Sequence, residues 1–325
     1  MTEHGGEVDA AAQRHGIPRD RWLDLSTGIN PNPYVLPELA REYWQRLPDA
    51  SLDSWLRESA ARYYGVADPA RVVPAPGSQA IIQLLPRLLP PTRVAVVKPS
   101  YREHMACWSA ADHRVAEVGD PEEIPEDAGV LAIANPNNPD GRLYSPDRLL
   151  RLGAQRLLVV DEAFADVAPD TSLACHAGHP NLVVLRSFGK FFGLAGMRLG
   201  FALAGEPLGT RLRRALGPWA VSGPAAAVGA VALADDAWTR AARVRLTAAA
   251  GRLDGLLMRS GLRVVGGTSL FRLVEHPRAQ DVFELLAGAA ILVRRFAEQP
   301  HWLRLGIPGD DEAFDRLGQA LAAWR

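Results

Sequence analysis

Four short apolar segments, separated by helical patterns, constrain the fold of this chain more than any other feature. The segments are residues 93–98, 130–134, 157–160 and 182–186. Each is too short for a typical helix and almost wholly apolar, as strands are when both faces of a parallel sheet are covered. The sequence therefore predicts an α/β fold with a buried, mostly parallel sheet in a large domain.

Polar residues follow these strands. Tyr101 comes just after the first strand, and Asn138 lies in a turn sequence after the second. Asp161 ends the third strand and Ser187 ends the fourth. Ligands of open α/β sheets bind beyond the carboxyl ends of the strands. We therefore expect these four side chains to share one site.

The pattern changes after residue 200. The sequence predicts an N-terminal arm over 1–30, a large domain over 31–220 and a smaller α+β domain over 221–325, which a long helix joins to the large one. Helices are expected at 7–15, 51–64, 78–85, 224–260, 279–288 and 311–324. Strands of the smaller domain are expected at 262–265, 269–274, 291–294 and 302–305, and residues 24–33 are expected to form an extended loop.

Composition excludes several classes of protein. The chain has 325 residues, 48% of them hydrophobic, and a formal net charge of −1, which gives no reason to expect nucleic acid or an acidic membrane as a partner. Two cysteines, Cys107 and Cys175, provide neither a disulfide framework nor a metal site. The first residues lack the pattern of a signal peptide, and no apolar run is long enough to span a membrane. We expect a cytoplasmic protein without a metal.

Lysine occurs only twice, at Lys98 and Lys190, and arginine fills every other cationic position. Lys190 lies in the segment Ser-Phe-Gly-Lys-Phe-Phe-Gly-Leu-Ala-Gly-Met-Arg-Leu-Gly, residues 187–200. An amine can lose its proton and attack a carbonyl, which a guanidinium cannot do. The sequence therefore predicts a catalytic Schiff-base lysine at Lys190, with a chance surface lysine as the alternative.

The other polar residues match the parts of pyridoxal phosphate. Asp161 can pair with the pyridine nitrogen and keep the ring protonated, which makes it an electron sink. Gly77, Ser78 and Gln79 open a helix, whose backbone N–H groups and dipole can bind the phosphate. The further candidates are Ser187 and Arg198 for the phosphate, Asn138 for the O3′ oxygen and Tyr101 for stacking on the ring.

Each of these residues also has an ordinary structural interpretation. Asp161-Glu162 can cap a helix, residues 137–141 form a strong turn signal, and Tyr101 can be a packing aromatic. Their occurrence together, each at a strand end or a helix start, indicates a pyridoxal-phosphate site.

Three motifs carry a family resemblance. They are Asn-Pro-Asn-Asn-Pro-Asp-Gly at 135–141, Asp-Glu-Ala-Phe at 161–164 and the lysine segment at 187–201. They resemble the fold-type I pyridoxal-phosphate enzymes of the histidinol-phosphate aminotransferase group. The resemblance supports the cofactor roles given above and implies a homodimer with active sites near the subunit interface. It also implies that Arg304 binds the carboxylate of the substrate.

Within that group, the chain is most similar to the L-threonine-O-3-phosphate decarboxylases of cobalamin biosynthesis. The shared features are His4-Gly5-Gly6 with the segment 25–31, which contains Gly28 and Asn30, phenylalanine at 164 where aminotransferases usually have tyrosine, and Gly189 before Lys190. The resemblance implies decarboxylation of L-threonine O-3-phosphate to (R)-1-amino-2-propanol O-2-phosphate. Substrate contacts are expected from Gly28, Asn30, Asn138 and Arg304, and the charges of His4 and Arg294 make them candidates for the substrate phosphate.

Two departures and two alternatives accompany this interpretation. Phe164 has no hydroxyl to donate to O3′, and Leu47 stands where aminotransferases commonly have a tyrosine that reaches the partner subunit's cofactor phosphate. Arg142 and Arg295 are also candidates for the substrate phosphate, or else ordinary surface charges. The alternative functions are an aminotransferase acting on histidinol phosphate or a related amine, and a catalytically idle binding partner.

Overall fold

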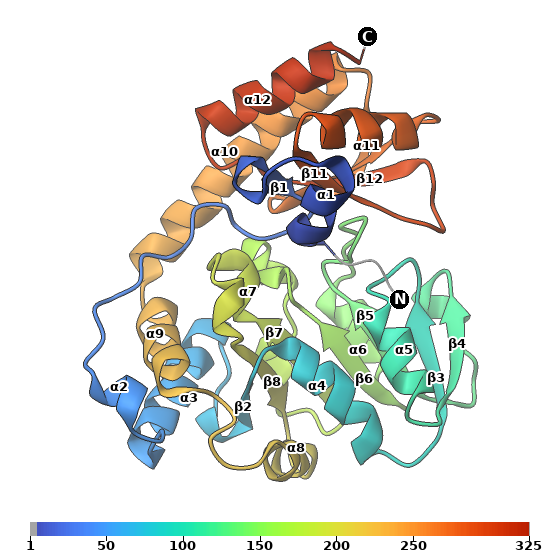
Figure 1. The fold of residues 1–325 in the computed structure, drawn as a ribbon. Coiled ribbons are helices and arrows are strands. Elements are labelled where there is room, and N and C mark those ends of the chain that lie inside the picture. The colour runs from blue at the N-terminus through green and yellow to red at the C-terminus, as the bar shows by residue number, and fades with distance from the viewer. Residues whose placement is uncertain (1–4, 325) are drawn as a thin grey trace. The chain divides into compact units, whose positions relative to one another are not determined.

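The computed structural model describes residues 5–324, which form two compact units (Figure 1). The large unit comprises Pro33–Asn138 and Arg142–Thr239. The small unit comprises the chain up to Asn32, the short segment Pro139–Gly141 and the chain from Arg240 onward. Each unit has its own sheet and its own hydrophobic core.

A seven-stranded sheet, counted within residues 5–324, forms the centre of the large unit, with strand order β2-β8-β7-β6-β5-β3-β4. Neighbouring strands are parallel except where β8 is involved, since β8 runs antiparallel to both β2 and β7. The prediction of a mostly parallel sheet is therefore confirmed. The strands are β2 Val72–Ala75, β3 Arg93–Val97, β4 Arg114–Val118, β5 Ala128–Ala134, β6 Leu157–Asp161, β7 Leu182–Ser187 and β8 Gly200–Ala204.

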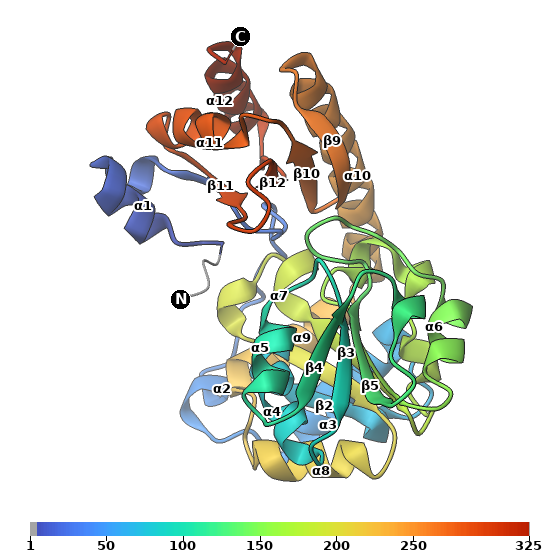
Figure 2. The same cartoon turned by 90° about the vertical axis from the view of Figure 1, so that its right-hand side faces the viewer.

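Burial of both faces of this sheet explains its apolar strands. On one face, Val94 and Val130 belong to the same buried cluster as Ile81 of α4 and Trp108 of α5. Figure 2 shows α4 and α5 on one side of β3, β4 and β5, and α6 on the other. The helices of this unit are α2 Glu42–Gln45, α3 Ala50–Tyr64, α4 Ser78–Leu84, α5 Glu103–Ser109, α6 Pro146–Leu152, α7 Phe188–Phe191, α8 Leu208–Leu216 and α9 Gly223–Leu233.

The helical region predicted over 224–260 is divided into α9 and α10 (Asp236–Arg259). The break occurs because the Asp235 side chain accepts a hydrogen bond from the Trp238 backbone N–H at 2.9 Å and so begins a new helix. Helix α9 packs against α3 and belongs to the large unit. The C-terminal part of the small unit therefore starts at Arg240, inside α10, where the sequence had placed the boundary at residue 221.

The small unit has a mixed sheet with strand order β1-β11-β12-β10-β9. Asp24 and Leu25 were expected in the loop 24–33 but belong to β1, which pairs in parallel with residues 291–293 of β11 and buries Leu25 in the core. No helix within residues 5–324 is long and apolar enough to cross a membrane. The elements are α1 Val8–His15, β1 Leu23–Leu25, β9 Arg263–Thr268, β10 Phe271–Glu275, α11 Ala279–Gly288, β11 Ile291–Arg295, β12 Trp302–Gly306 and α12 Asp311–Ala322.

Candidate active site

Strands β5, β6 and β7 are neighbours that end at the same edge of the large sheet. Ala134 of β5 pairs with Asp161 of β6, and the Asn135 backbone N–H donates to the Asp161 carbonyl at 2.9 Å. Ser187 ends β7, and Asn138 lies in the loop that follows β5. The structure thus brings Asn138, Asp161 and Ser187 to one edge of the sheet, as parallel strand ends require.

His104 is a site residue that sequence reasoning missed. Its Nε2 lies 2.9 Å from Asp161 Oδ2, and both side chains are almost completely buried. Asp161 Oδ1 accepts from the Ala163 backbone N–H at 3.0 Å, so the carboxylate also caps the turn that follows β6. In the chain, 57 residues separate His104 from Asp161, so the sequence gives no sign of their contact. Its position shortly after Tyr101 is the one feature that could have marked His104 as a site residue.

The start of α4 lies against Arg198. Gly77 has φ +85°, and a Cβ added to it would come within 2.8 Å of Arg198 Nη2. A Cβ on Gly200 would lie 2.3 Å from the Ser78 backbone nitrogen, so glycine is required there as well. These contacts place a guanidinium beside the amide groups at the N-terminus of a helix, an arrangement that attracts a phosphate.

The Gln79 side chain takes part in a hydrogen-bond chain within the site. The Tyr101 hydroxyl donates to Gln79 Oε1 at 3.1 Å, and Gln79 Nε2 donates to Glu103 Oε2 at 3.0 Å. Burial raises the pKa of Tyr101 to about 12, with smaller contributions from Glu103 and Asp161. The hydroxyl therefore stays protonated and keeps its bond to Gln79. These two bonds hold the Gln79 side chain toward Tyr101 and Glu103, while its backbone N–H lies in the first turn of α4.

Lys190 lies in α7, the short helix directly after β7. Its neighbours Phe188 and Phe191 are fully buried, which fixes the helix in the core. A Cβ on Gly189 would lie 2.7 Å from Ala195 Cα, so the close turn needs glycine beside the lysine. Lys190 Nζ lies 5.8 Å from the ring centroid of the buried Phe164. Phe164 therefore lies near the amine, and its ring offers no hydroxyl.

A buried ionic cluster lies next to these residues in the chain. Arg186 Nη1 contacts Glu162 Oε2 at 2.6 Å, and Nη2 contacts Asp166 Oδ1 at 2.7 Å. All three side chains are at most 3% exposed. Burial raises the pKa of Glu162, and Arg186 together with the Ser172 hydroxyl counteracts the rise. Because Glu162 follows Asp161 and Arg186 precedes Ser187, the cluster holds the ends of β6 and β7.

Two arginines of the small unit lie side by side. Arg294 of β11 and Arg304 of β12 are direct partners in the antiparallel register. Arg304 is only 7% exposed, and burial, together with Arg294, lowers its pKa to about 10, while Asp24 acts in the opposite direction. The surroundings as a whole disfavour its positive charge, so an added anion would relieve this electrostatic penalty.

Other predicted substrate residues have different environments. Gly28 and Asn30 are buried in the small unit, where Asn30 Oδ1 accepts from the Asn32 backbone N–H at 3.0 Å. His4 lies outside the described residues. Arg142 donates to the Lys98 carbonyl at 3.0 Å, and the Arg295 guanidinium lies 4.8 Å from the centroid of the Phe283 ring.

The side chains of the large unit fit pyridoxal phosphate. Lys190 has an amine that could bind the cofactor aldehyde, Asp161 has a buried carboxylate, and Arg198 has a cation beside Gly77, where a side chain would clash with it. The fold and these groups define a pyridoxal-phosphate enzyme of fold type I. The chain belongs to the aminotransferase class I and II family, whose sequence profile matches residues 22–321.

Within that family, the chain is similar to proteins of two activities, threonine-phosphate decarboxylases and histidinol-phosphate aminotransferases. The chain is 48% identical to the threonine-phosphate decarboxylase of Pseudomonas aeruginosa, over 100% of this chain and 98% of the relative. It is 31% identical to the histidinol-phosphate aminotransferase of Citrifermentans bemidjiense, over 93% and 91%. The histidinol-phosphate aminotransferase of Sinorhizobium meliloti, solved in complex with pyridoxal-5'-phosphate, has a TM-score of 0.82 at 21% identity, over 98% and 95%.

Proposed function

We propose that this protein uses pyridoxal phosphate to decarboxylate L-threonine O-3-phosphate, a step of cobalamin biosynthesis that yields (R)-1-amino-2-propanol O-2-phosphate. The observation that carries the proposal is the 48% identity, over the full chain, to a threonine-phosphate decarboxylase. The chain also has a lysine, a buried carboxylate and a guanidinium that could hold and activate the cofactor, at Lys190, Asp161 and Arg198.

In the large unit, Lys190 binds the cofactor aldehyde, and Asp161 pairs with the pyridine nitrogen. His104 holds the Asp161 carboxylate in place through its 2.9 Å contact. When bound, pyridoxal phosphate takes up the electrons that the breaking bond at the substrate α-carbon releases. The other cofactor contacts would come from Gly77, Ser78, Gln79, Ser187 and Arg198 to the phosphate, Asn138 to O3′ and Tyr101 to the ring face.

In the small unit, Arg304 binds the substrate carboxylate. A bidentate guanidinium pair fixes the orientation of a carboxylate, and orientation decides which bond at the α-carbon breaks. Pyridoxal phosphate would accept the electrons left when CO2 departs, and Lys190 or a water would then return a proton to the α-carbon. Further substrate contacts are assigned to His4, Gly28, Asn30, Asn138 and Arg294.

Transamination is the second candidate function. The 31% identity to a histidinol-phosphate aminotransferase supports it, and the same cofactor residues serve both reactions. In that case, the proton at the α-carbon would be removed in place of the carboxylate. The third possibility, an inactive binding partner, gains no support from a chain that retains Lys190, Asp161 and Arg198.

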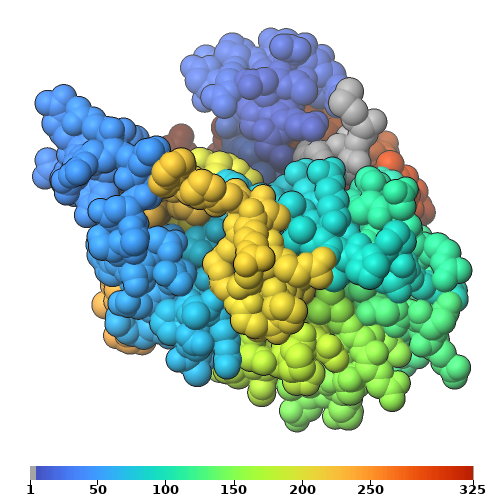
Figure 3. All heavy atoms as spheres, turned by 90° about the horizontal axis from the view of Figure 1, so that it is seen from below, coloured from blue at the N-terminus to red at the C-terminus, as the bar shows by residue number. Residues whose placement is uncertain are grey.

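We propose that the protein is a homodimer in the cytoplasm and that an exposed apolar surface of the large unit forms the interface. Trp44 is 69% exposed, Leu47 66% and Trp219 59%. Figure 3 shows the segments that carry them, 35–55 (blue) and 205–222 (yellow), on one face. Such a surface is unusual for a monomer. A second copy is the partner that this family resemblance implies.

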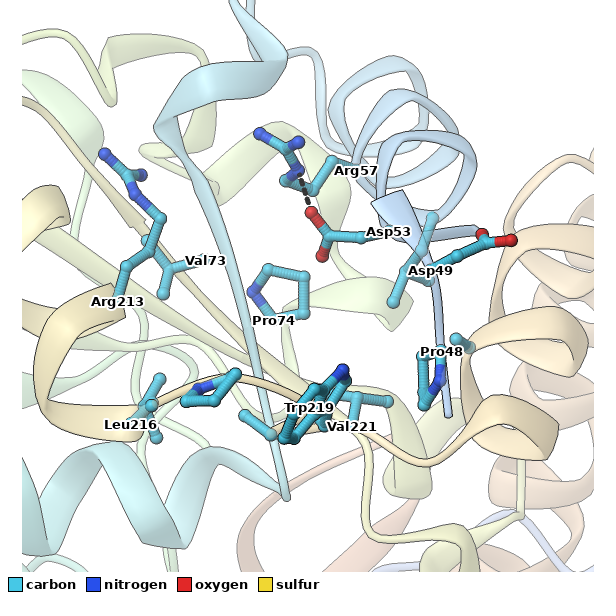
Figure 4. Close-up of a pocket in the computed structure, with 15 residues that line it drawn as sticks. Pro48, Asp49, Asp53, Arg57, Val73, Pro74, Arg213, Leu216, Trp219 and Val221 are labelled. Carbon is cyan, nitrogen blue, oxygen red and sulfur yellow. Dashed lines mark ion pairs between the residues drawn. The ribbon is translucent and has the colours of Figure 1, made fainter. Parts of the chain in front are cut away.

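Trp219 also has strained geometry. Its φ is +59°, which a bulky residue adopts only when its surroundings enforce it. It lines an open hollow together with Pro48 and Pro74, beside the ion pair between Asp53 and Arg57 (Figure 4). Burial against a second copy would supply the packing that this exposed indole lacks.

Light scattering tests the dimer. Trp44→Asp and Trp219→Asp are expected to shift the molar mass from dimer to monomer. Val244→Asp is the matched control, because Val244 is an equally exposed apolar residue, 71% exposed on α10, outside this surface. A monomeric wild-type protein at micromolar concentration would refute the proposal.

The reaction is tested by incubating the cofactor-loaded protein with L-threonine O-3-phosphate while CO2 release and the visible absorbance are followed. The expected result is CO2 release with the cofactor spectrum restored after each turnover. Lys190→Ala is the control and should abolish release. Absence of CO2, with conversion to the pyridoxamine form by an amino donor, would establish the aminotransferase instead.

A further inference from the structure

A compact turn follows β1 in the small unit. Asp24 Oδ1 accepts from the Ser26 backbone N–H at 2.8 Å and from the Ser26 hydroxyl at 2.5 Å. Because the hydroxyl proton points to Asp24, the lone pairs of Ser26 Oγ remain available to an outside donor. Ser26 is only 2% exposed, so each of these polar contacts is made away from solvent.

The chain next to the N-terminus uses that acceptor. The Gly6 backbone N–H donates to Ser26 Oγ at 2.7 Å. A Cβ on Gly5 would lie 2.5 Å from the Ser26 carbonyl oxygen, so a side chain at this position would force the backbone apart. Gly6 has φ +86°, which also favours glycine. The two glycines thus allow the N-terminal chain to lie directly on Ser26.

The opposite side of Ser26 contacts Arg304. Arg304 Nη2 donates to the Ser26 carbonyl at 2.9 Å, although 278 residues separate the two in the chain. Gly306 makes this approach possible, since a Cβ there would lie 2.4 Å from the Thr27 carbonyl oxygen. The carbonyl of Ser26 therefore fixes one edge of the guanidinium, while its hydroxyl holds Gly6.

We propose that Ser26, held by Asp24, is the positioning residue for Arg304 and couples the Gly5-Gly6 segment to the anion that Arg304 binds. The inference deepens the proposed function, because the anion is taken to be the carboxylate of a phosphorylated amino acid. With one edge bonded to Ser26, the guanidinium can turn only a limited set of its N–H groups to the substrate. The orientation of the Arg304 guanidinium is then fixed before the substrate binds.

Ser26→Ala tests this role. The change removes the hydroxyl that joins Asp24 to Gly6 and leaves the Arg304 guanidinium with a carbonyl partner that can move. KM for L-threonine O-3-phosphate is expected to rise roughly five- to tenfold, the effect of one or two lost hydrogen bonds. kcat should change less than about twofold, and the cofactor absorbance should not change, because Ser26 lies in the other compact unit from Lys190.

Ser260→Ala is the matched control. Ser260 is a buried serine of the same unit, 8% exposed, whose hydroxyl donates to the Leu256 carbonyl at 3.1 Å. It loses a comparable hydrogen bond without touching Arg304, so its KM should stay at the wild-type value. If Ser260→Ala raises KM as much as Ser26→Ala does, the effect is general destabilisation and the proposal is overturned.

Gly5→Ala tests the coupling to the N-terminal segment. A methyl group at position 5 collides with the Ser26 carbonyl, so KM should rise as in Ser26→Ala, again with kcat retained. An unchanged KM in Gly5→Ala would remove the N-terminal segment from the proposal, and an unchanged KM in Ser26→Ala would overturn it altogether.

Failure of the proposed function is recognised separately. If the wild-type protein releases no CO2, the decarboxylase assignment fails by itself. Calorimetric binding of L-threonine O-3-phosphate to the cofactor-loaded wild-type, Ser26→Ala and Ser260→Ala proteins then tests the inference alone. Weaker binding by Ser26→Ala only would support it, and equal binding by all three would refute it.

Discussion

Replacement of Arg186 by methionine should destabilise the large unit more than any surface charge change. Arg186 makes two short contacts, 2.6 Å to Glu162 and 2.7 Å to Asp166, and all three side chains are at most 3% exposed. Methionine fills much of the volume but leaves two buried carboxylates without their cation. Breaking such a pair costs about 3–5 kcal/mol, a large part of a typical stability of about 5–15 kcal/mol.

The loss should depend on pH in a defined direction. Burial already raises the pKa of Glu162, and removal of Arg186 raises it further. A carboxyl whose pKa is higher in the folded than in the unfolded state loses stability as pH rises above the unfolded value, and regains it when protonated. The difference in unfolding free energy between Arg186→Met and wild type should therefore be larger at pH 8 than at pH 5.

Arg148→Met is the appropriate control. Arg148 also pairs with two carboxylates, Asp120 at 2.7 Å and Glu122 at 3.0 Å, but its side chain is 30% exposed. Its loss should change the unfolding free energy by less than about 1 kcal/mol. Urea denaturation followed by tryptophan fluorescence measures both variants. Equal effects of the two substitutions, or a pH-independent effect for Arg186→Met, would refute the argument from burial.

Three further substitutions test the active site. Asp161→Asn should lower kcat about 100-fold or more, because the pyridine nitrogen would lose the carboxylate that keeps it protonated. CO2 release measures kcat, and the absorbance shows whether the cofactor remains bound. Phe164→Tyr should lower the pH midpoint of the visible absorbance change, since a phenol can stabilise the deprotonated cofactor; an unchanged midpoint would argue against any electronic role for Phe164. Arg304→Lys should raise KM roughly tenfold through loss of bidentate geometry.

Local sequence determined most secondary structure and the chemistry of the cofactor site. Apolar runs of four to six residues predicted β3, β5, β6 and β7, because burial on both faces leaves no polar alternation. The rarity of lysine singled out Lys190, and strand-end residues such as Asp161 predicted one edge of the sheet as the site. These signals are local, since they depend on neighbours in the chain.

Only the tertiary structure decided how distant segments meet. The sequence around Asp161 does not predict its contact with His104, which forms because α5 packs on the same sheet that carries Asp161. The role of Ser26 is equally hidden, since its partner Arg304 is 278 residues away. Asp24 and Leu25, which were expected in a loop, form a strand because β1 pairs with β11. Periodicity in a sequence encodes which face of an element is buried, whereas hydrogen bonds between remote side chains depend on which buried faces pack together.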